Sequence, residues 1–285
     1  MKQSLGFRIV IWVGIAVLLL WSLGPIYWTL ASSVTPSNDF SARPIHFFPQ
    51  NFTLNHFERL LGINVDRIGG VQVWAQFRSA LFNSIVASLA ATVACVAIAA
   101  FGGYAFTRLS FPGRRVLFIA VVATLAIPGY AVLIPLYRLM IGMHLVDTFV
   151  GITLIYISAY LPLTLWLMRS VFESLPLSLE EAAQIDGAGR LYIFFRIVLP
   201  LVGPGLTAAA ILTFLGAWGQ YLVPLVFSPV ATKPLTVLVP EFATKNFIDY
   251  GLITAAGSIA IVVPALVVIF LNRYLVTGLL AGSAR

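Results

Sequence analysis

The stretch LEEAAQIDGAGRLYIFFRIVLP occupies residues 179–200 and concentrates charge in a chain that is 60% hydrophobic and only 9% charged. Its charged side chains are Glu180, Glu181, Asp186, Arg190 and Arg196. Long apolar runs lie on both sides of the stretch. Because such runs are typical of membrane-spanning helices, the stretch indicates a compact non-membrane element inserted between them.

The apolar runs around this stretch predict the fold class. Six runs of 21 or more residues contain no Asp, Glu, Lys or Arg, and about 20 apolar residues in a helix span a bilayer core. We therefore predict an all-α, polytopic membrane protein with six transmembrane helices, residues 1–285 forming a single transmembrane domain. A buried soluble core would not give six charge-free runs of similar length. The predicted spans are 9–32, 79–107, 116–137, 148–168, 203–228 and 250–272.

The distribution of Lys and Arg predicts the orientation. Six spans place both termini on one side, and cytoplasmic termini leave ten basic residues inside and seven outside. The short turn 108–115, with three arginines and no acid, favours the same orientation. The 33–76 and 229–249 loops are then exterior, and the net charge of +7 reflects topology rather than a basic face for nucleic acid. The first run is longer than a signal-peptide core, so we expect an uncleaved helix.

Within 176–200 the residue pattern predicts a helix–turn–helix on the cytoplasmic side. Ser178 and Glu181 have the S-x-x-E spacing of a capping box, in which the hydroxyl and the carboxylate satisfy free backbone N–H groups. Glu180 and Glu181 suit the positive end of the helix dipole. Gly187 suits a left-handed C-terminal cap, and a second short helix over about 190–198 runs into Pro200.

The first of these helices has the composition of a docking surface. Leu179, Ala182 and Ala183 form a small apolar patch surrounded by acids, and small side chains permit a partner to approach closely. The alternative is a helix lying on lipid headgroups, which would favour Lys and Arg on the polar face. The predicted docking residues are Ser178, Glu180, Glu181, Ala182, Ala183, Asp186 and Gly187.

The motifs that this chain lacks narrow its chemistry. None of its three lysines follows a glycine, so it contains no P-loop and is not expected to be an enzyme that hydrolyses a nucleotide by that route. The predicted spans contain no carboxylate, which disfavours a proton relay and leaves open a sodium site built from carbonyls. The three histidines, His46, His56 and His144, have no metal-binding spacing, so we expect solvated loop residues and no metal site.

The segment 181–200 resembles the EAA signature of ABC importer permeases. Glu181-Ala182-Ala183, Gly187, Ile197 and Leu199-Pro200 match it at the full spacing. Other segments are similar to maltose-type carbohydrate permeases in the same order, from about residue 9 to the end, and suit the smaller of the two permease subunits. These segments are LFNSIVAS (81–88), YAFTRLSFPGRR (104–115), IPLYRLM (134–140), LPLTLWLMRSVFESLP (161–176) and LVTGLLAG (275–282).

This resemblance implies a mechanism and a set of partners. The 177–198 segment would be a coupling helix region seated on a cytoplasmic ATPase dimer, with Glu181 as the docking carboxylate and Gly187 as the turn. ATP and Mg²⁺ would be bound by that ATPase, and no cofactor by this chain. A second permease subunit, a solute-binding protein outside the bilayer and a sugar-type substrate complete the assembly in a bacterial inner membrane. The 229–249 loop would reach the binding protein, and the 276–285 tail the ATPase dimer.

Five side chains in the second and fifth spans are candidates for a translocation path. They are Asn83, Ser84, Trp218, Gln220 and Tyr221. Aromatic rings stack on sugars and amides bind hydroxyls, but ordinary helix packing or an interfacial belt explains these residues equally well. The resembling family often has Asn-Glu after the tryptophan, whereas this chain has Gly219-Gln220.

Three functions are compatible with the sequence. The resemblance favours the permease subunit of an ABC importer that moves a sugar or sugar derivative by alternating access. A self-contained secondary carrier for a small polar solute is the main alternative, and the missing intramembrane carboxylates disfavour it. A membrane scaffold that uses the acidic segment only for recruitment is the third. Association with an ATPase and a second permease distinguishes the importer from the other two.

Overall fold

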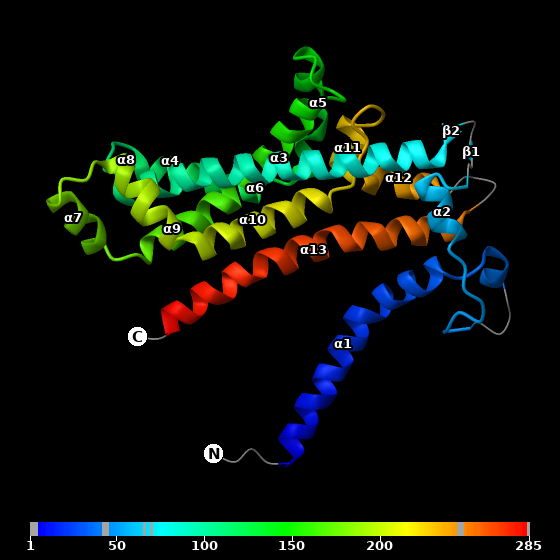
Figure 1. Cartoon of the computed structure of the whole chain (residues 1–285). Helices are drawn as coiled ribbons and strands as arrows, with labels where there is room; N and C mark the ends of the chain where they lie inside the picture. Colours follow the sequence, from blue (N-terminus) through cyan, green and yellow to red (C-terminus); the bar gives the residue numbers. More distant parts are fainter. Residues whose placement is uncertain (1–4, 42–45, 65–66, 69–70, 244–247, 284–285) are drawn as a thin grey trace. The chain divides into compact units, whose positions relative to one another are not determined.

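The computed structural model describes residues 5–41, 46–64, 67–68, 71–243 and 248–283 (Figure 1). Contacts divide the chain into two compact units. Unit 1 comprises residues 1–78 and 238–262, and unit 2 comprises residues 79–237 and 263–285. The described part of the chain is almost entirely helical, with two strands of two residues each, which confirms the predicted class of helical membrane protein.

Unit 1 contains one long apolar helix and several short elements. Its elements are α1 (Leu5–Ser33), η1 (Ser37–Ser41), α2 (Asn55–Leu61), the antiparallel strands β1 (Arg67–Ile68) and β2 (Val71–Gln72), and the first part of α13 (Tyr250–Ser283). Helix α2 ends at Gly62, whose φ of +79° places it in the left-handed region that glycine adopts without strain.

The prediction of a solvated His56 was wrong. His56 is buried, and its Nε2 lies 3.0 Å from the carbonyl oxygen of Thr35. One helical turn further on, Arg59 pairs with Asp249 at 2.7 Å, just before α13 begins. A side chain at Gly251 would collide with the His56 ring, so this glycine lets α2 pack against the start of α13.

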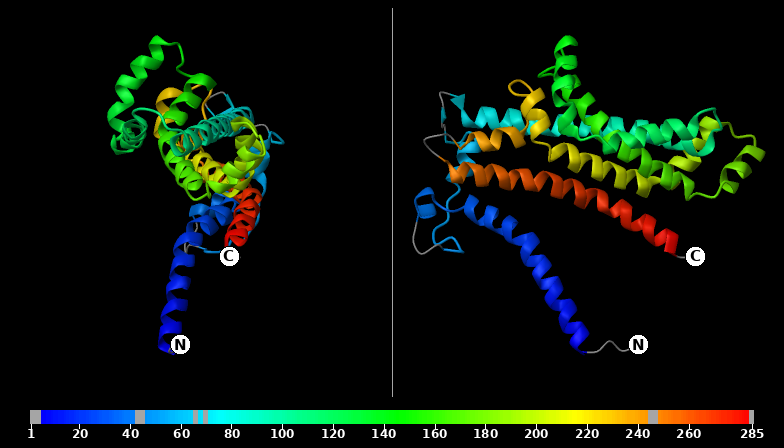
Figure 2. Two further views of the ribbon diagram at one scale, coloured as in Figure 1. Left: turned by 90° about the vertical axis from the view of Figure 1, so that its left-hand side faces the viewer. Right: turned by 180° about the vertical axis from the view of Figure 1, so that it is seen from behind.

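Unit 2 is built around three helices that run side by side in both figures, α3 (Val73–Arg108), α6 (Phe149–Glu173) and α10 (Gly203–Trp218) (Figures 1 and 2). Small residues allow their close packing. A Cβ atom at Gly103 would lie 3.0 Å from the backbone nitrogen of Arg169, so the glycine allows a close approach of α3 to α6 that a side chain would crowd.

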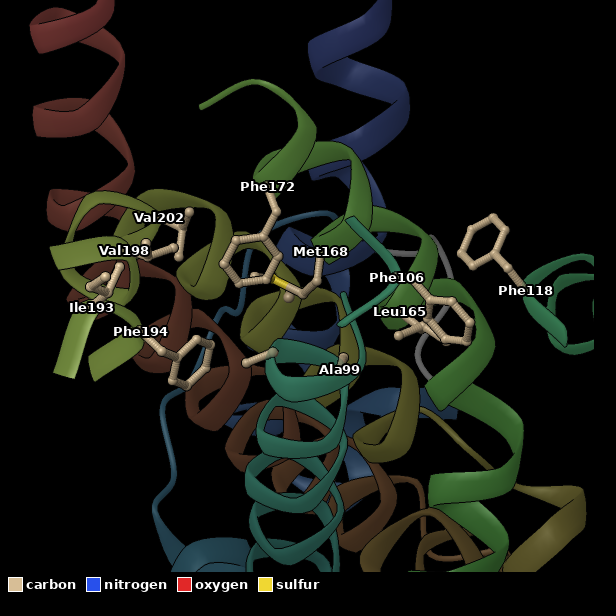
Figure 3. Packing of buried hydrophobic residues seen from close by; sticks show 12 residues of the cluster. Ala99, Phe106, Phe118, Leu165, Met168, Phe172, Ile193, Phe194, Val198 and Val202 are labelled. Carbon is tan, nitrogen blue, oxygen red and sulfur yellow. The ribbon is translucent and has the colours of Figure 1, made fainter. Parts of the chain in front are cut away.

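At the end of unit 2 that carries α7 (Ser178–Ile185), buried side chains join five helical segments into one cluster, here called the inner core (Figure 3). Met168 and Phe172 of α6 lie in its middle, and both are fully buried. The inner core consists of Ala99, Ala100, Phe106, Phe118, Leu165, Met168, Phe172, Ile193, Phe194, Val198, Val202 and Ala209.

The predicted third span, 116–137, is not one helix. It is divided among α4 (Arg114–Ala123), η2 (Thr124–Ala126), η3 (Gly129–Val132) and α5 (Leu133–Gly142), with a bend of 95° between the two halves. The break lies at Pro128, and the preceding Ile127 is extended with ψ of 121°. Proline disfavours helical dihedrals in the residue before it, so the helix ends there.

The predicted fifth span, 203–228, is also shorter than expected. Helix α10 ends at Trp218, and α11 (Leu222–Phe227) and α12 (Leu235–Glu241) follow as separate elements. Before α10 the chain runs through α8 (Arg190–Tyr192), a π-helical segment η4 (Ile193–Val198) and α9 (Leu199–Leu201), and it then bends by 73°. Proline and two glycines at 203–205 stand at the start of α10. Among the described residues, four helices are long and apolar enough to span a membrane, or up to six if each bent pair is one span.

Candidate functional site

Helix α7 forms where the sequence predicts it, but the predicted capping box was wrong. Leu177 already has helical dihedrals, with φ of −63° and ψ of −28°, and no side chain caps the helix. The carbonyl of Leu177 accepts hydrogen bonds from the N–H groups of Glu180 and Glu181. Ser178 is therefore the first helical residue, and a capping residue needs non-helical dihedrals that Ser178 does not have.

The C-terminal end of α7 matches the prediction. Gly187 has a φ of +85°. Its N–H donates to the carbonyl of Gln184 at 3.0 Å, and the N–H of Ala188 donates to the carbonyl of Ala183 at 2.9 Å. This pair of hydrogen bonds is the Schellman arrangement, which reverses the chain sharply and satisfies the last carbonyls of the helix.

Glu180 lies inside unit 2 and not on its surface. Only 3% of the residue is exposed. One carboxylate oxygen accepts from the Arg108 Nε at 2.5 Å, and the other accepts from the Tyr104 hydroxyl at 2.8 Å. The predicted docking set therefore contains one member that faces the protein interior. The sequence carried a signal for this contact, because Tyr104 and Arg108 are four residues apart and share a helix face.

The remaining predicted docking residues lie on the outer side of α7 and its turn. Glu181, Ala182 and Asp186 are exposed, Ala183 is half-buried, and Leu179 is 44% exposed. Ser178 and Gly187 are exposed as well. The turn encloses an open groove of about 500 Å³, lined by Ala183, Asp186, Gly187, Ala188, Gly189, Tyr192 and Ile197. Small side chains, an acid and an aromatic ring around a groove suit the insertion of side chains from another protein.

Two of the candidate translocation residues contact a loop. Asn83 and Ser84 are buried near the start of the second predicted span. The Asn83 amide donates to the carbonyls of Ala231 and Lys233, at 3.1 and 3.0 Å, and the Ser84 hydroxyl accepts from the N–H of Leu235 at 2.7 Å. These contacts position the chain between α11 and α12.

Gln220 reaches the same loop from the other side. Its side-chain amide donates to the Tyr160 hydroxyl at 2.6 Å, and its main-chain carbonyl accepts from the Thr236 hydroxyl at 2.6 Å. The structure thus gathers Asn83, Ser84 and Gln220 around residues 231–236. Trp218 is buried and stacks on Phe214, with the ring centroids 5.7 Å apart. Tyr221 is 41% exposed.

Asp147 is a residue that the sequence analysis missed. It adopts a positive φ of 57°, and its carboxylate accepts from the N–H groups of Ala231 and Thr232 at 2.8 and 3.0 Å. It also accepts from the Thr232 hydroxyl at 3.1 Å and from the N–H of Val230 at 3.4 Å. Burial raises the pKa of this carboxyl, but the hydrogen bonds together lower it below its ordinary value of 3.8. An isolated Asp after a predicted span gave no sign of this long-range contact.

Comparisons with known proteins agree with the geometry. Residues 96–280 match the model of the family described as binding-protein-dependent transport system inner membrane component. The chain is 34% identical to a probable ABC transporter permease protein of Pyrococcus horikoshii, over 93% of this chain and 95% of that protein. It is 32% identical to the trehalose transport system permease protein of Mycobacterium tuberculosis, over 93% of each.

A solved structure shares the fold. It is a bacterial ABC transporter involved in the import of the acidic polysaccharide alginate. One of its chains is 23% identical to this chain, with a TM-score of 0.79, and the likeness covers 96% of this chain and 98% of that one.

Proposed function

The chain belongs to the family of binding-protein-dependent transport system inner-membrane components, and from this premise we propose that it is a permease subunit that imports a sugar or sugar derivative. The observation that carries the proposal is the outer side of α7, where Glu181, Ala182 and Asp186 are exposed beside a sharp glycine turn. A short helix with exposed acids, located at one end of long apolar helices, is suited to dock a separate protein that drives the transport.

The chain acts without catalysing ATP hydrolysis itself. It has no P-loop, so ATP and Mg²⁺ are bound by a partner ATPase dimer that docks on α7. Closure of the ATPase dimer moves the spans between inward-open and outward-open states. A partner shifts such an equilibrium only by binding the two states differently. The docking contact also has to be rigid, because a flexible contact would not transmit the motion of the ATPase to the spans.

We propose an orientation with α7 and both termini on the cytoplasmic side of a bacterial inner membrane. The arginine-rich turn 108–115 precedes α4 and favours the cytoplasmic side. The opposite end of unit 2 then faces outward, and there the 230–236 loop is held by Asp147, Asn83 and Ser84. A loop held in one conformation is suited to contact a solute-binding protein, because little ordering entropy is lost on association.

A sugar-type substrate is supported by the trehalose transport relative and by the sequence resemblance to carbohydrate permeases. The five candidate path residues do not carry this part of the proposal, since three of them have structural partners among residues 231–236. A second permease subunit would complete the path. Residues 1–285 would act as one permease domain.

The proposal is tested with the purified assembly reconstituted in vesicles, containing both permeases, the ATPase and the binding protein. ATPase activity is measured with trehalose, maltose, a polyol and a glycerol phosphate. We expect one compound to stimulate hydrolysis several-fold in the wild type. Glu181→Arg should abolish this stimulation because it reverses the exposed docking charge. The matched control is Glu173→Arg, which changes an exposed acid at the end of α6 and not on α7.

Two outcomes would contradict the proposal. Solute uptake by vesicles that lack the ATPase would indicate a self-contained carrier. Equal stimulation of the wild type and Glu181→Arg would show that α7 is not the docking element.

A further inference from the structure

A buried ion pair connects α7 to α3. The Glu180 side chain is 4% exposed and the Arg108 side chain 11% exposed, and Nε of the arginine donates to the carboxylate at 2.5 Å. The ion pair of Arg169 and Glu173 on α6 differs, with side chains 32% and 49% exposed. Removing one partner of a buried ion pair lowers the stability of the fold much more than removing one partner of an exposed pair. The remaining charge is then left away from water without a partner.

Three segments meet at this pair. Tyr104 and Arg108, both near the end of α3, contact the two oxygens of Glu180. Nη2 of Arg108 also donates to the carbonyl of Leu175 at 2.9 Å, in the connection from α6 to α7. Arg108 therefore holds both the first turn of α7 and the chain that leads into it.

The pair is built into the wall of the inner core. The Tyr104 ring packs edge-on against Phe172 at 5.8 Å and against Phe194 at 5.0 Å between ring centroids. These phenylalanines belong to α6 and η4, the segments before and after α7. Apolar packing on this scale resists movement, and a fully paired polar group within it specifies one arrangement.

The adjacent residues Glu180 and Glu181 point in different directions and have different contacts. Consecutive residues of an α-helix point about 100° apart, so Glu180 faces the protein while Glu181 is exposed. We propose that Arg108 and Tyr104 are positioning residues that clamp Glu180, so that α7 and the end of α3 move as one rigid piece when the ATPase moves. This inference rests on the proposed function. It assigns the connection between α7 and the rest of the permease to Glu180, a side chain that does not touch the ATPase.

The test measures the distance between α7 and the end of α3 in the whole assembly. Cys95 is the only cysteine of this chain, so Cys95→Ala, assembled with partner subunits whose reactive cysteines are also replaced, gives a background for two spin labels. Labels at Ser110→Cys and Gln184→Cys occupy exposed positions beyond α3 and on α7. Pulsed electron paramagnetic resonance is recorded without nucleotide and after trapping with ATP and vanadate. For the wild-type clamp we expect one narrow distance distribution that is the same in both states.

Glu180→Gln removes the charge and keeps the shape of the side chain. We expect the width of the distribution to increase at least twofold and its maximum to shift on trapping. Tyr104→Phe, which removes one of the hydrogen bonds, should give a smaller change of the same kind. The exchange Arg108→Glu with Glu180→Arg restores the ion pair but not the hydrogen bond to the Leu175 carbonyl. It should therefore narrow the distribution in part, a rescue that a loss of general stability would not produce. Glu173→Gln is the matched control and should leave the wild-type distribution unchanged.

The result that overturns the clamp is a narrow, nucleotide-independent distribution in both Glu180→Gln and Tyr104→Phe. Retention of the ATPase during purification is scored separately for every variant. If Glu180→Gln does not assemble, Tyr104→Phe decides the matter, because it leaves the ion pair in place. A wild-type chain that retains no ATPase would refute the proposed function, whereas an unchanged distribution in assembled variants would refute only the clamp.

Discussion

At the scale of single residues, Asp147 shows how one side chain organises a loop. Its own N–H donates to the carbonyl of Phe227 at 2.7 Å, while its carboxylate accepts from the N–H groups of residues 230–232. The residue therefore holds the chain on both sides of the turn after α11. Three backbone donors directed at one carboxylate favour its charged form, which is the reason for its lowered pKa.

The lowered pKa of Asp147 leads to a prediction about pH. A carboxyl whose folded-state pKa lies below the unfolded value stabilises the fold above the unfolded value, here 3.8, and loses this contribution as pH falls through the folded value. We expect the amides of Ala231 and Thr232 to keep their protection from hydrogen exchange down to about pH 5 and to lose it in stronger acid. Mass spectrometry of the loop peptide measures this.

Asp147→Asn provides the control for that measurement. It removes the charged acceptor, and hydrogen bonds to charged groups contribute about 1.5–3 kcal/mol. Exchange at residues 230–232 should therefore become at least ten times faster at neutral pH, about 1.4 kcal/mol per tenfold change, and should lose its acid transition. The same acid transition in Asp147→Asn would show that another group titrates.

At the scale of elements, the turn after α7 gives a second prediction. A residue other than glycine in the left-handed conformation costs about 1–2 kcal/mol, and Gly187 has a φ of +85°. Gly187→Ala should therefore weaken retention of the ATPase, measured by co-purification. Gly203→Ala is the control, because Gly203 lies at the start of α10 and outside the groove, has no left-handed φ, and has open space around its Cβ position. Equal losses in both variants would refute a conformational role for Gly187.

The elements also show what can be predicted from sequence and why the rest cannot. Charge-free runs located the long apolar helices, since a helix needs a certain apolar length to cross a bilayer. The same runs concealed the breaks at Pro128 and after Trp218, because composition does not report backbone direction. Gly187 was predicted correctly since its signal is local. The contacts of Glu180 and Asp147 join residues more than 70 positions apart, and no local pattern records them.

At the scale of the whole molecule, the proposed orientation is open to a direct test. Ser110 and Ile63 are exposed residues. The prediction places Ser110 on the cytoplasmic side of the membrane and Ile63 on the exterior side. In the Cys95→Ala background, we expect an impermeant maleimide added to intact cells to label Ile63→Cys and not Ser110→Cys. Both should react after the cells are permeabilised, which controls for local reactivity. Labelling of Ser110→Cys in intact cells would show that the orientation is the reverse of the proposed one.

The opposite orientations of Glu180 and Glu181 have a genetic consequence. The partner of Glu180 is Arg108 in the same polypeptide, so we expect a substitution at residue 108 to compensate for a charge lost at residue 180. Glu181 has its proposed partner in another polypeptide. In a search for suppressors, revertants of Glu180 substitutions should map within this gene, and revertants of Glu181 substitutions should map to the gene of the ATPase. Two neighbouring codons would thus belong to different networks of epistasis.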